Sequence, residues 1–216
     1  MSTNKYKIAL ITGRAFPWVQ DQFIKIKKWP IKIPIYLEHS LVSFVNDQLS
    51  ISEIGKKFIE NYETQIIDRV DLLLKEKFFR FIKTKLTNPE PGLDYIWEDK
   101  LAMISIVTTN ENPNPTPIQR IVDEVIQQLQ LQNEIKIGYH HLGVDILPRD
   151  TSKRTAANHA QGILDPKNAI NKWICFGDNI SDKEMTLAKP KISEFVYTEN
   201  ASQDVLDYLY QNNYTD

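Results

Sequence analysis

Cysteine is almost absent from this sequence, and neither sign of charge is in excess. Cys175 is the single cysteine among 216 residues, which excludes a disulfide framework and a cysteine-based zinc site. Lysine and arginine number 26 and aspartate and glutamate 28, for a formal net charge of −2. Nucleic-acid-binding domains and proteins that bind anionic membranes are usually strongly basic. We therefore expect neither a nucleic acid nor a membrane as partner.

Long apolar segments are also lacking. No apolar run reaches the ~18 residues that a membrane span requires, and the first residues, Met-Ser-Thr-Asn-Lys-Tyr-Lys, do not resemble a signal peptide. These features predict a cytoplasmic protein. A chain of 216 residues with 42% hydrophobic residues can bury a core without staples, as one domain or as a core with an inserted cap.

Both ends of the chain have the pattern of an α/β protein. Residues 7–11 form a short apolar run that predicts a buried strand, residues 17–28 predict an amphipathic helix, and residues 33–37 predict a second strand. The last part repeats this alternation, with helices expected at 151–162 and 201–211 and strands at 172–176 and 195–198. The sequence therefore predicts an α/β fold.

The middle of the chain has a different pattern. Residues 52–86 carry apolar side chains at helical spacing, which predicts one or two long helices ending before the Thr-Asn-Pro-Glu-Pro-Gly segment at 87–92. Further on, the pattern predicts strands at 101–107, 135–140 and 143–147 and a helix at 118–131. We therefore divide the chain into a core at 1–45, an α+β cap at 46–148 and the rest of the core at 149–216.

Three polar clusters follow predicted strands or begin predicted helices, where ligands bind in open α/β sheets. The hydroxyl of Thr12 and the backbone at Gly13 and Arg14 could hold a phosphoryl oxygen, although such residues are common in turns. Lys153 could neutralise an anion or simply be solvated. Asp178 and Asp182, four residues apart, could bind Mg²⁺ or cap the next helix.

Taken in order, these clusters resemble the motifs of a known family. The segments are Ala9-Leu-Ile-Thr-Gly-Arg14, Val144-Asp-Ile-Leu-Pro-Arg-Asp-Thr-Ser-Lys153 and Ile174-Cys-Phe-Gly-Asp-Asn-Ile-Ser-Asp182-Lys-Glu-Met185. The chain resembles the haloacid dehalogenase superfamily of phosphatases, in the branch with a large cap between the second and third motifs. The Val-Asp-Ile-Leu-Pro segment is most similar to the sucrose-phosphate phosphatase subgroup. The segment Trp97-Glu-Asp-Lys-Leu-Ala-Met-Ile-Ser105 is similar to a cap strand of trehalose-phosphate phosphatases.

The resemblance implies a fold and a chemistry. The fold would be a Rossmann-like core with a parallel sheet and an inserted α+β cap, and the activity would be Mg²⁺-dependent hydrolysis of the phosphoric monoester of a sugar phosphate. Thr12, with Gly13 and Arg14, would bind the phosphoryl group, and Lys153 would stabilise its charge. Asp178 would ligate Mg²⁺, and Asp182 would support the metal site.

The sequence departs from the family at one motif. Family members begin with a strand ending in Asp-x-Asp, whose first aspartate is the nucleophile, and residues 1–216 contain no Asp-x-Asp. The chain begins at what resembles the second core strand. We therefore expect a core without its first strand, in which residues 8–11 pair directly with 174–176, and an impaired or inactive phosphatase. The alternatives are a non-catalytic protein that binds a sugar phosphate or regulates through it, and a fragment with no settled function. An Asp-x-Asp strand encoded upstream of Met1 would instead indicate an active phosphatase.

Other reactive residues have simpler interpretations. His140 and His141 lie on a predicted strand and would point to opposite faces. A metal ion shared by this pair with Asp145 is therefore not expected, and both histidines are interpreted as exposed cap residues. Cys175 lies in an apolar run, where cysteine behaves as a small hydrophobic residue. No feature of the sequence predicts an oligomeric state.

Overall fold

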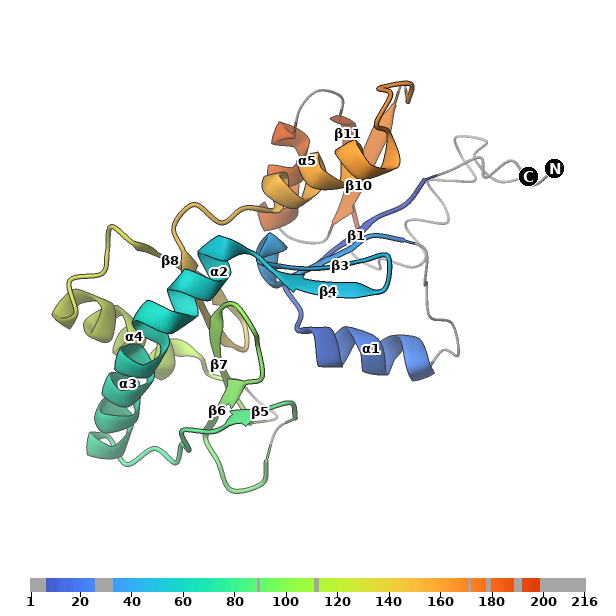
Figure 1. The fold of residues 1–216 in the computed structure, drawn as a ribbon. Coiled ribbons are helices and arrows are strands. Elements are labelled where there is room, and N and C mark those ends of the chain that lie inside the picture. The colour runs from blue at the N-terminus through green and yellow to red at the C-terminus, as the bar shows by residue number, and fades with distance from the viewer. Residues whose placement is uncertain are drawn as a thin grey trace. The chain divides into compact units, whose positions relative to one another are not determined.

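The computed structural model describes residues 7–25, 33–88, 90–110, 113–170, 172–177, 180–188 and 192–198. Figure 1 shows its helices and strands. The chain divides into two units, one with residues up to Ile11 and from Ser152 onward, the other with Thr12 to Thr151. Each unit is described below by itself. None of the helices in the described ranges is long and apolar enough to cross a membrane.

A five-stranded sheet forms the centre of the larger unit. Its strands are β5 (Lys85–Leu86), β6 (Tyr95–Glu98), β7 (Ile104–Thr108), β8 (Ile135–His140) and β9 (Gly143–Pro148), in the order β5-β6-β7-β9-β8. The β5–β6 pair is parallel and the other pairs are antiparallel. Every residue of β7 is buried. The strand predicted at 101–107 begins three residues later, at Ile104.

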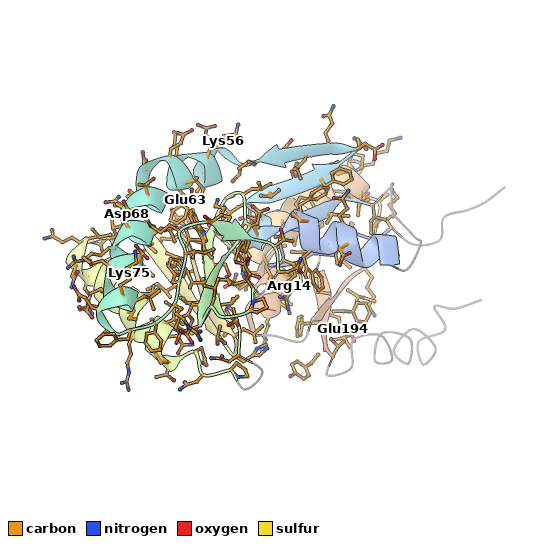
Figure 2. All side chains as sticks on the ribbon, turned by 90° about the horizontal axis from the view of Figure 1, so that it is seen from below. Arg14, Lys56, Glu63, Asp68, Lys75 and Glu194 are labelled. Atoms are coloured by element: carbon orange, nitrogen blue, oxygen red, sulfur yellow. The ribbon has the colours of Figure 1, made fainter. Side chains whose placement is uncertain are left out.

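Helices α3 (Thr64–Glu76) and α4 (Thr116–Gln128) pack their apolar sides into the core of this sheet. Helix α2 (Glu53–Phe58) is capped by Ser52, whose Oγ accepts the backbone N–H of Gly55 at 3.1 Å. A π-helical turn, Ile59–Glu63, joins α2 to α3. Figure 2 labels charged residues that follow one another along this helical stretch: Lys56, Glu63, Asp68 and Lys75.

The helix expected to reach residue 86 ends ten residues earlier, so the prediction is wrong for residues 77–86. Phe78 has a positive φ of 62° and is 93% exposed, whereas Phe79 and Phe81 pack against the core. The apolar positions beyond Glu76 therefore reach the core through a chain reversal followed by strand β5. Helical spacing alone does not separate these two arrangements.

A second, antiparallel group of strands precedes α2. It contains β2 (Ile35–Leu37), β3 (Val42–Val45) and β4 (Gln48–Ile51), with β2 paired to β3 and β3 to β4. A short 3₁₀ turn, Glu38–Ser40, connects β2 to β3. Helix α1 (Phe16–Lys25) comes before this group in the chain. It begins one residue before the predicted range 17–28, whose last three residues lie outside the described residues.

The smaller unit contains β1 (Leu10–Ile11), α5 (Lys153–Leu164), β10 (Trp173–Gly177), a 3₁₀ helix (Ile180–Leu187) and β11 (Ile192–Tyr197). Strands β10 and β11 are parallel. Ala157, Met185 and Ala188 form a small buried cluster, and Ile11 and Cys175 pack against it. Burial, and then the charge of Asp182, raise the pKa of the Cys175 thiol to about 11, so this thiol is protonated at neutral pH.

The predicted direct pairing of residues 8–11 with 174–176 is wrong. Among the described residues β10 pairs only with β11, and β1 is not one of its partners. Ile11 and Cys175 contribute instead to the same apolar cluster. Side-chain packing, rather than a ladder of backbone hydrogen bonds, thus relates the two strands. The helix predicted at 201–211 lies outside the described residues.

Candidate functional site

The Thr12–Arg14 turn is held in place by backbone hydrogen bonds. The N–H of Thr12 donates to the carbonyl of Tyr36 at 2.8 Å, and the N–H of His39 donates to the carbonyl of Thr12 at 3.4 Å. The N–H of Arg14 donates to Thr12 Oγ1 at 3.2 Å. This predicted phosphoryl-binding turn therefore lies at the end of β2.

Gly13 lies against the imidazole of His39, which a side chain at this position would displace. A Cβ built at Gly13 would lie 2.9 Å from His39 Nε2, closer than carbon and nitrogen atoms normally approach. The imidazole of His39 therefore occupies the space beside the turn.

A charged cluster, which we call the Lys100 cluster, adjoins Gly13. It consists of Lys100, Asp145, Glu98, His39 and His140. Lys100 is only 4% exposed, and its Nζ lies 3.3 Å from the carbonyl oxygen of Gly13, 3.3 Å from Asp145 Oδ1 and 3.4 Å from Glu98 Oε2. A buried ammonium requires such partners, because an unpaired buried charge is strongly unfavourable.

Two histidines face the same carboxylate. His39 Nε2 lies 3.7 Å from Asp145 Oδ2, and His140 Nε2 lies 3.8 Å from Asp145 Oδ1. The interpretation of His140 as an exposed cap residue is therefore wrong. Strand β8 turns His140 toward Asp145 on the neighbouring strand β9, while His141 follows the strand and is exposed.

Burial and charge act in opposite directions on the members of this cluster. Burial alone would raise the pKa of Asp145, but Lys100, His39 and His140 outweigh it and hold that pKa below its usual range. Burial alone would lower the pKa of Lys100, but Asp145, Glu98 and Glu38 raise it. The pKa of His140 is lowered, mainly by burial. At neutral pH the cluster therefore contains an ammonium and an ionised Asp145 in direct contact.

The connection between β2 and β3 positions His39. Glu38, His39 and Ser40 have positive φ values of 49°, 56° and 82°, a conformation that residues other than glycine rarely adopt. Glu38 is fully buried, and its carboxylate accepts the backbone N–H groups of Leu101 and Ala102 at 2.8–3.1 Å. These bonds hold a strained turn, a feature that occurs often at functional sites.

The sequence analysis did not identify four residues of this site: Glu38, His39, Glu98 and Lys100. Two signals could have found them. Glu38 and His39 directly follow the apolar run 33–37, at the end of a strand, and Glu98 and Lys100 lie within the Trp97–Ser105 segment that is similar to a cap strand of trehalose-phosphate phosphatases.

The smaller unit brings together two further residues that the sequence singles out. Lys153 is the first residue of α5, and the Oγ of Ser152 caps this helix by accepting the N–H of Arg154. The Nζ of Lys153 donates to Asp182 Oδ1, and both side chains are buried. A Cβ at Gly177 would lie 2.3 Å from the Cβ of Asp182, so only glycine there allows Asp182 to lie against the end of β10.

Asp178, the other predicted magnesium ligand, lies outside the described residues. Within those residues no group of three or more histidine, cysteine, aspartate or glutamate side chains is arranged to hold a metal ion. Asp182 offers hard oxygen atoms of the kind that Mg²⁺ prefers, but it also accepts the hydrogen bond from Lys153. The described part of this predicted site is therefore the ion pair of Lys153 with Asp182.

Sequence comparison finds no match for this chain, either among models of protein families or among curated proteins. Solved structures do match. A Thermoplasma acidophilum protein has a TM-score of 0.59 at 16% identity, covering 97% of this chain and 84% of that one. A trehalose-6-phosphate phosphatase related protein has a TM-score of 0.53 at 14% identity, with the same two coverages.

A third structure is the sucrose-phosphatase of Synechocystis in complex with sucrose and phosphate. Its TM-score is 0.52 at 14% identity, covering 94% of this chain and 74% of that one. Identities this low concern the fold alone. The chain thus has a mixed α/β fold with several sheets that matches the folds of the trehalose-6-phosphate phosphatase related protein and the sucrose-phosphatase over most of its length.

Proposed function

We propose that this protein binds a sugar phosphate and derives from Mg²⁺-dependent sugar-phosphate phosphatases of the haloacid dehalogenase type, closest in kind to sucrose-phosphate phosphatases. The phosphate would lie at the Thr12–Arg14 turn and the sugar at the Lys100 cluster. One observation carries the proposal. The Nζ of Lys100 reaches the carbonyl of Gly13, so the turn and the cluster form one continuous polar site.

The chemistry of the cluster suits a polyhydroxylated molecule. A sugar hydroxyl both donates and accepts hydrogen bonds. Asp145 and Glu98 offer acceptors, Lys100 offers donors, and an imidazole offers either. Because Asp145 is ionised at neutral pH, its hydrogen bonds to hydroxyls would be charge-assisted and therefore stronger than neutral ones.

The phosphate would be recognised by different groups. At the turn, the hydroxyl of Thr12, the backbone N–H of Gly13 and the guanidinium of Arg14 are donors that suit a dianion. Lys153 of the smaller unit is the residue that the resemblance assigns to the phosphoryl charge. Its ammonium is buried beside Asp182, which keeps it ordered.

Magnesium, if bound, would take carboxylate oxygens from Asp178 and Asp182. It would polarise a phosphoryl oxygen as a Lewis acid. The contribution of this chain's own side chains is to hold Asp182 in a fixed orientation, through Lys153 on one side and Gly177 on the other.

The attacking group is the part that residues 1–216 do not supply. An aspartyl-phosphate route needs a carboxylate nucleophile, and no Asp-x-Asp motif occurs in the sequence. Loss of a nucleophile removes most of the rate, although surviving electrostatic groups leave an acceleration of about 10³–10⁴ over water in the best-studied hydrolase. Such a rate is undetectable for phosphate monoesters, whose uncatalysed hydrolysis is among the slowest known.

A phosphate-release assay tests this proposal. Residues 1–216 with Mg²⁺ should release no measurable phosphate from sucrose 6-phosphate, trehalose 6-phosphate or p-nitrophenyl phosphate. An N-terminal extension with a strand ending in Asp-x-Asp should restore release, and the same extension with Asn-x-Asn should not. Robust release by residues 1–216 that disappears in Asp178→Asn would contradict the proposal.

The second candidate is a non-catalytic sugar-phosphate-binding or regulatory protein. The observation that favours it is the absence of Asp-x-Asp from the 216 residues. The two candidates differ in the extended protein. A protein that has lost its catalytic geometry would bind the sugar phosphate but remain inactive after the Asp-x-Asp strand is added.

A further inference from the structure

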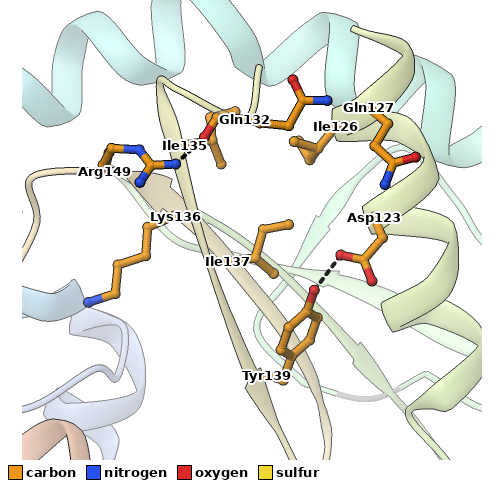
Figure 3. A pocket seen from close by; sticks show the side chains of 9 residues that line it. All are labelled: Asp123, Ile126, Gln127, Gln132, Ile135, Lys136, Ile137, Tyr139 and Arg149. Atoms are coloured by element: carbon orange, nitrogen blue, oxygen red, sulfur yellow. Dashed lines mark hydrogen bonds between the residues drawn. The ribbon is translucent and has the colours of Figure 1, made fainter. Parts of the chain in front are cut away.

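The five-stranded sheet has one face covered by helices and another that carries Glu98 and Asp145 of the Lys100 cluster. Residues that pair directly across strands share a face, and consecutive residues of a strand alternate between the faces. Trp97 belongs to the apolar core that contains α3 and α4, so Glu98, the next residue of β6, lies on the other face. Figure 3 shows the same alternation on β8, where Tyr139 points toward α4 and Lys136 points to the opposite side.

Lys85 lies on the helix-covered face. It pairs with Trp97 across β5 and β6, and its Nζ is 5.1 Å from the centre of the Trp97 ring, within the range of a cation–π contact. The same ammonium lies 2.6 Å from Glu63 Oε1. Glu63, labelled in Figure 2, ends the π-helical turn between α2 and α3. Such turns often occur at functional sites, and this one ends at the carboxylate that holds Lys85.

Lys85 also contacts the backbone of Lys100. Its Nζ donates to the carbonyl oxygen of Lys100 at 2.8 Å. The N–H of the same peptide group belongs to Leu101, and it donates to the two carboxylate oxygens of Glu38 at 2.9 and 3.1 Å. An ammonium therefore holds the oxygen end of this peptide group, and a carboxylate holds its N–H end. Because the peptide dipole is negative at its oxygen, both charges stabilise this one orientation.

We propose that Lys85, held by Glu63, is a positioning residue for Lys100. The orientation of the Lys100–Leu101 peptide group determines the direction in which the side chain of Lys100 leaves the backbone. In the observed orientation Lys100 Nζ lies 3.3 Å from Asp145 Oδ1. An ion pair on the helix-covered face thus fixes a cation on the opposite face of the sheet, without itself belonging to the cluster.

The effect on ligand binding follows from this arrangement. Binding groups recognise a ligand precisely when neighbouring residues lock their geometry. Without the ammonium of Lys85, the carbonyl of Lys100 loses its donor, and the peptide group is held at its N–H end only. Lys100 would then be less well placed to bind a sugar hydroxyl together with Asp145. This effect on binding rests on the proposed function, whereas the positioning of Lys100 does not.

Amide hydrogen exchange of the full chain without ligand, measured by NMR, tests the positioning. In Lys85→Met the N–H of Leu101 should exchange about tenfold faster through local opening, whereas the amides of the central strand β7 should be much less affected. Lys83→Met is the matched control, because Lys83 pairs with Asp68 of α3 at 2.8 Å, and it should leave the Leu101 amide unchanged. An unchanged Leu101 amide in Lys85→Met, or an equal acceleration of Leu101 and β7, overturns the inference.

Two further variants separate the contact from the fold. Lys85→Arg keeps a charged donor and should keep the exchange of the Leu101 amide slow. Glu63→Gln serves if Lys85→Met does not fold. It should accelerate the same amide, because a neutral amide holds the ammonium of Lys85 less firmly than a carboxylate. Exchange in Glu63→Gln equal to that of the native protein would contradict the role of the π-helical turn.

Calorimetric titration extends the test to the ligand. Lys85→Met should bind sucrose 6-phosphate about tenfold more weakly than the native protein, as is typical when a residue that orients a binding group is lost, and should bind inorganic phosphate unchanged. Equal affinities of Lys85→Met and a native protein that binds sucrose 6-phosphate overturn the role of Lys85 in binding. If the native protein binds no sugar phosphate, the proposed function fails, and the exchange of the Leu101 amide alone decides the inference.

Discussion

Lys100 is buried among acceptors that only the fold brings together. Its partners come from a turn near the start of the chain, from β6 and from β9, so 87 and 45 residues separate Lys100 from Gly13 and Asp145. Breaking a buried ion pair by removing one partner leaves the other charge uncompensated, and this typically costs about 3–5 kcal/mol. The Lys100 cluster is thus a feature of stability as well as of binding.

We predict that Lys100→Met lowers the free energy of unfolding by about 3 kcal/mol or more, measured by urea denaturation. Lys83→Met is the matched control. Lys83 pairs with Asp68 at 2.8 Å, and both side chains are about half exposed; exposed ion pairs contribute little. Equal midpoints for the two variants would show that the buried pair does not stabilise the fold.

The lowered pKa of Asp145 predicts that the free energy of unfolding depends on pH. Its pKa in the folded protein is below the ordinary value of about 3.9, so its contribution is present above that ordinary value and is lost as the pH falls through the folded pKa. Between pH 5 and 2 the urea midpoint of the native protein should fall more steeply than that of Asp145→Asn. Parallel curves for the two proteins would contradict the ion pair.

Part of the candidate site could be predicted from local sequence patterns. Thr12, Lys153 and Asp182 carry a local signal, because each follows a strand or begins a helix, and the structure brings Lys153 and Asp182 together. His39 follows the apolar run 33–37 and Lys100 lies in the Trp97–Ser105 segment, but neither signal predicts that both contact Asp145. Their roles depend on a positive-φ turn and on pairings between distant strands, which no local pattern encodes.

At the scale of elements, the packing of β7 against β9 depends on one glycine. A Cβ at Gly143 would lie 2.1 Å from the carbonyl oxygen of Ile106 and 2.8 Å from the Cα of Val107. These are backbone atoms of the central strand, which cannot move aside without breaking the ladder. The strand prediction for 143–147 is confirmed within one residue, but the requirement for glycine follows only from the pairing.

We predict that Gly143→Ala lowers the free energy of unfolding by about 4–5 kcal/mol, a loss that few single substitutions cause. Thermal unfolding followed by circular dichroism is the measurement. Gly138→Ala, in the adjacent strand, is the control, because its Cβ would be 3.7 Å from the nearest atom, an ordinary contact. A melting temperature for Gly143→Ala equal to that of Gly138→Ala would refute this account of the pairing.

Helix ends and strand partners are the parts of the elements that the sequence did not predict. Apolar spacing located α3 and α4 but extended the first stretch through residues 77–86, where Phe79 and Phe81 return to the core in a non-helical conformation. The resemblance to the family, with its first strand missing here, also led to the expectation of a β1–β10 pair, which is not formed among the described residues. Both errors arise because burial can be satisfied by packing as well as by regular hydrogen bonding.

At the scale of the whole molecule, the fold matches solved phosphatase structures, while the binding of a sugar phosphate is our proposal. The proposed division of labour separates phosphate, at the Thr12–Arg14 turn, from sugar, at the Lys100 cluster. The predicted boundaries of core and cap, at residues 45 and 148, remain a prediction. Both parts of the proposed site should therefore contribute to the affinity for a sugar phosphate, whether or not it is hydrolysed.

The most direct test is calorimetric titration of the protein with sucrose 6-phosphate, the free sugar and inorganic phosphate. We predict that the sugar phosphate binds more tightly than either part, and that Asp145→Asn weakens it at least tenfold, about 1.4 kcal/mol, while inorganic phosphate binds unchanged. His140→Gln serves if Asp145→Asn does not fold, and Asp150→Asn is the control. Equal affinities for phosphate and sugar phosphate, or a sugar phosphate affinity unchanged by both cluster variants, would contradict the proposed site.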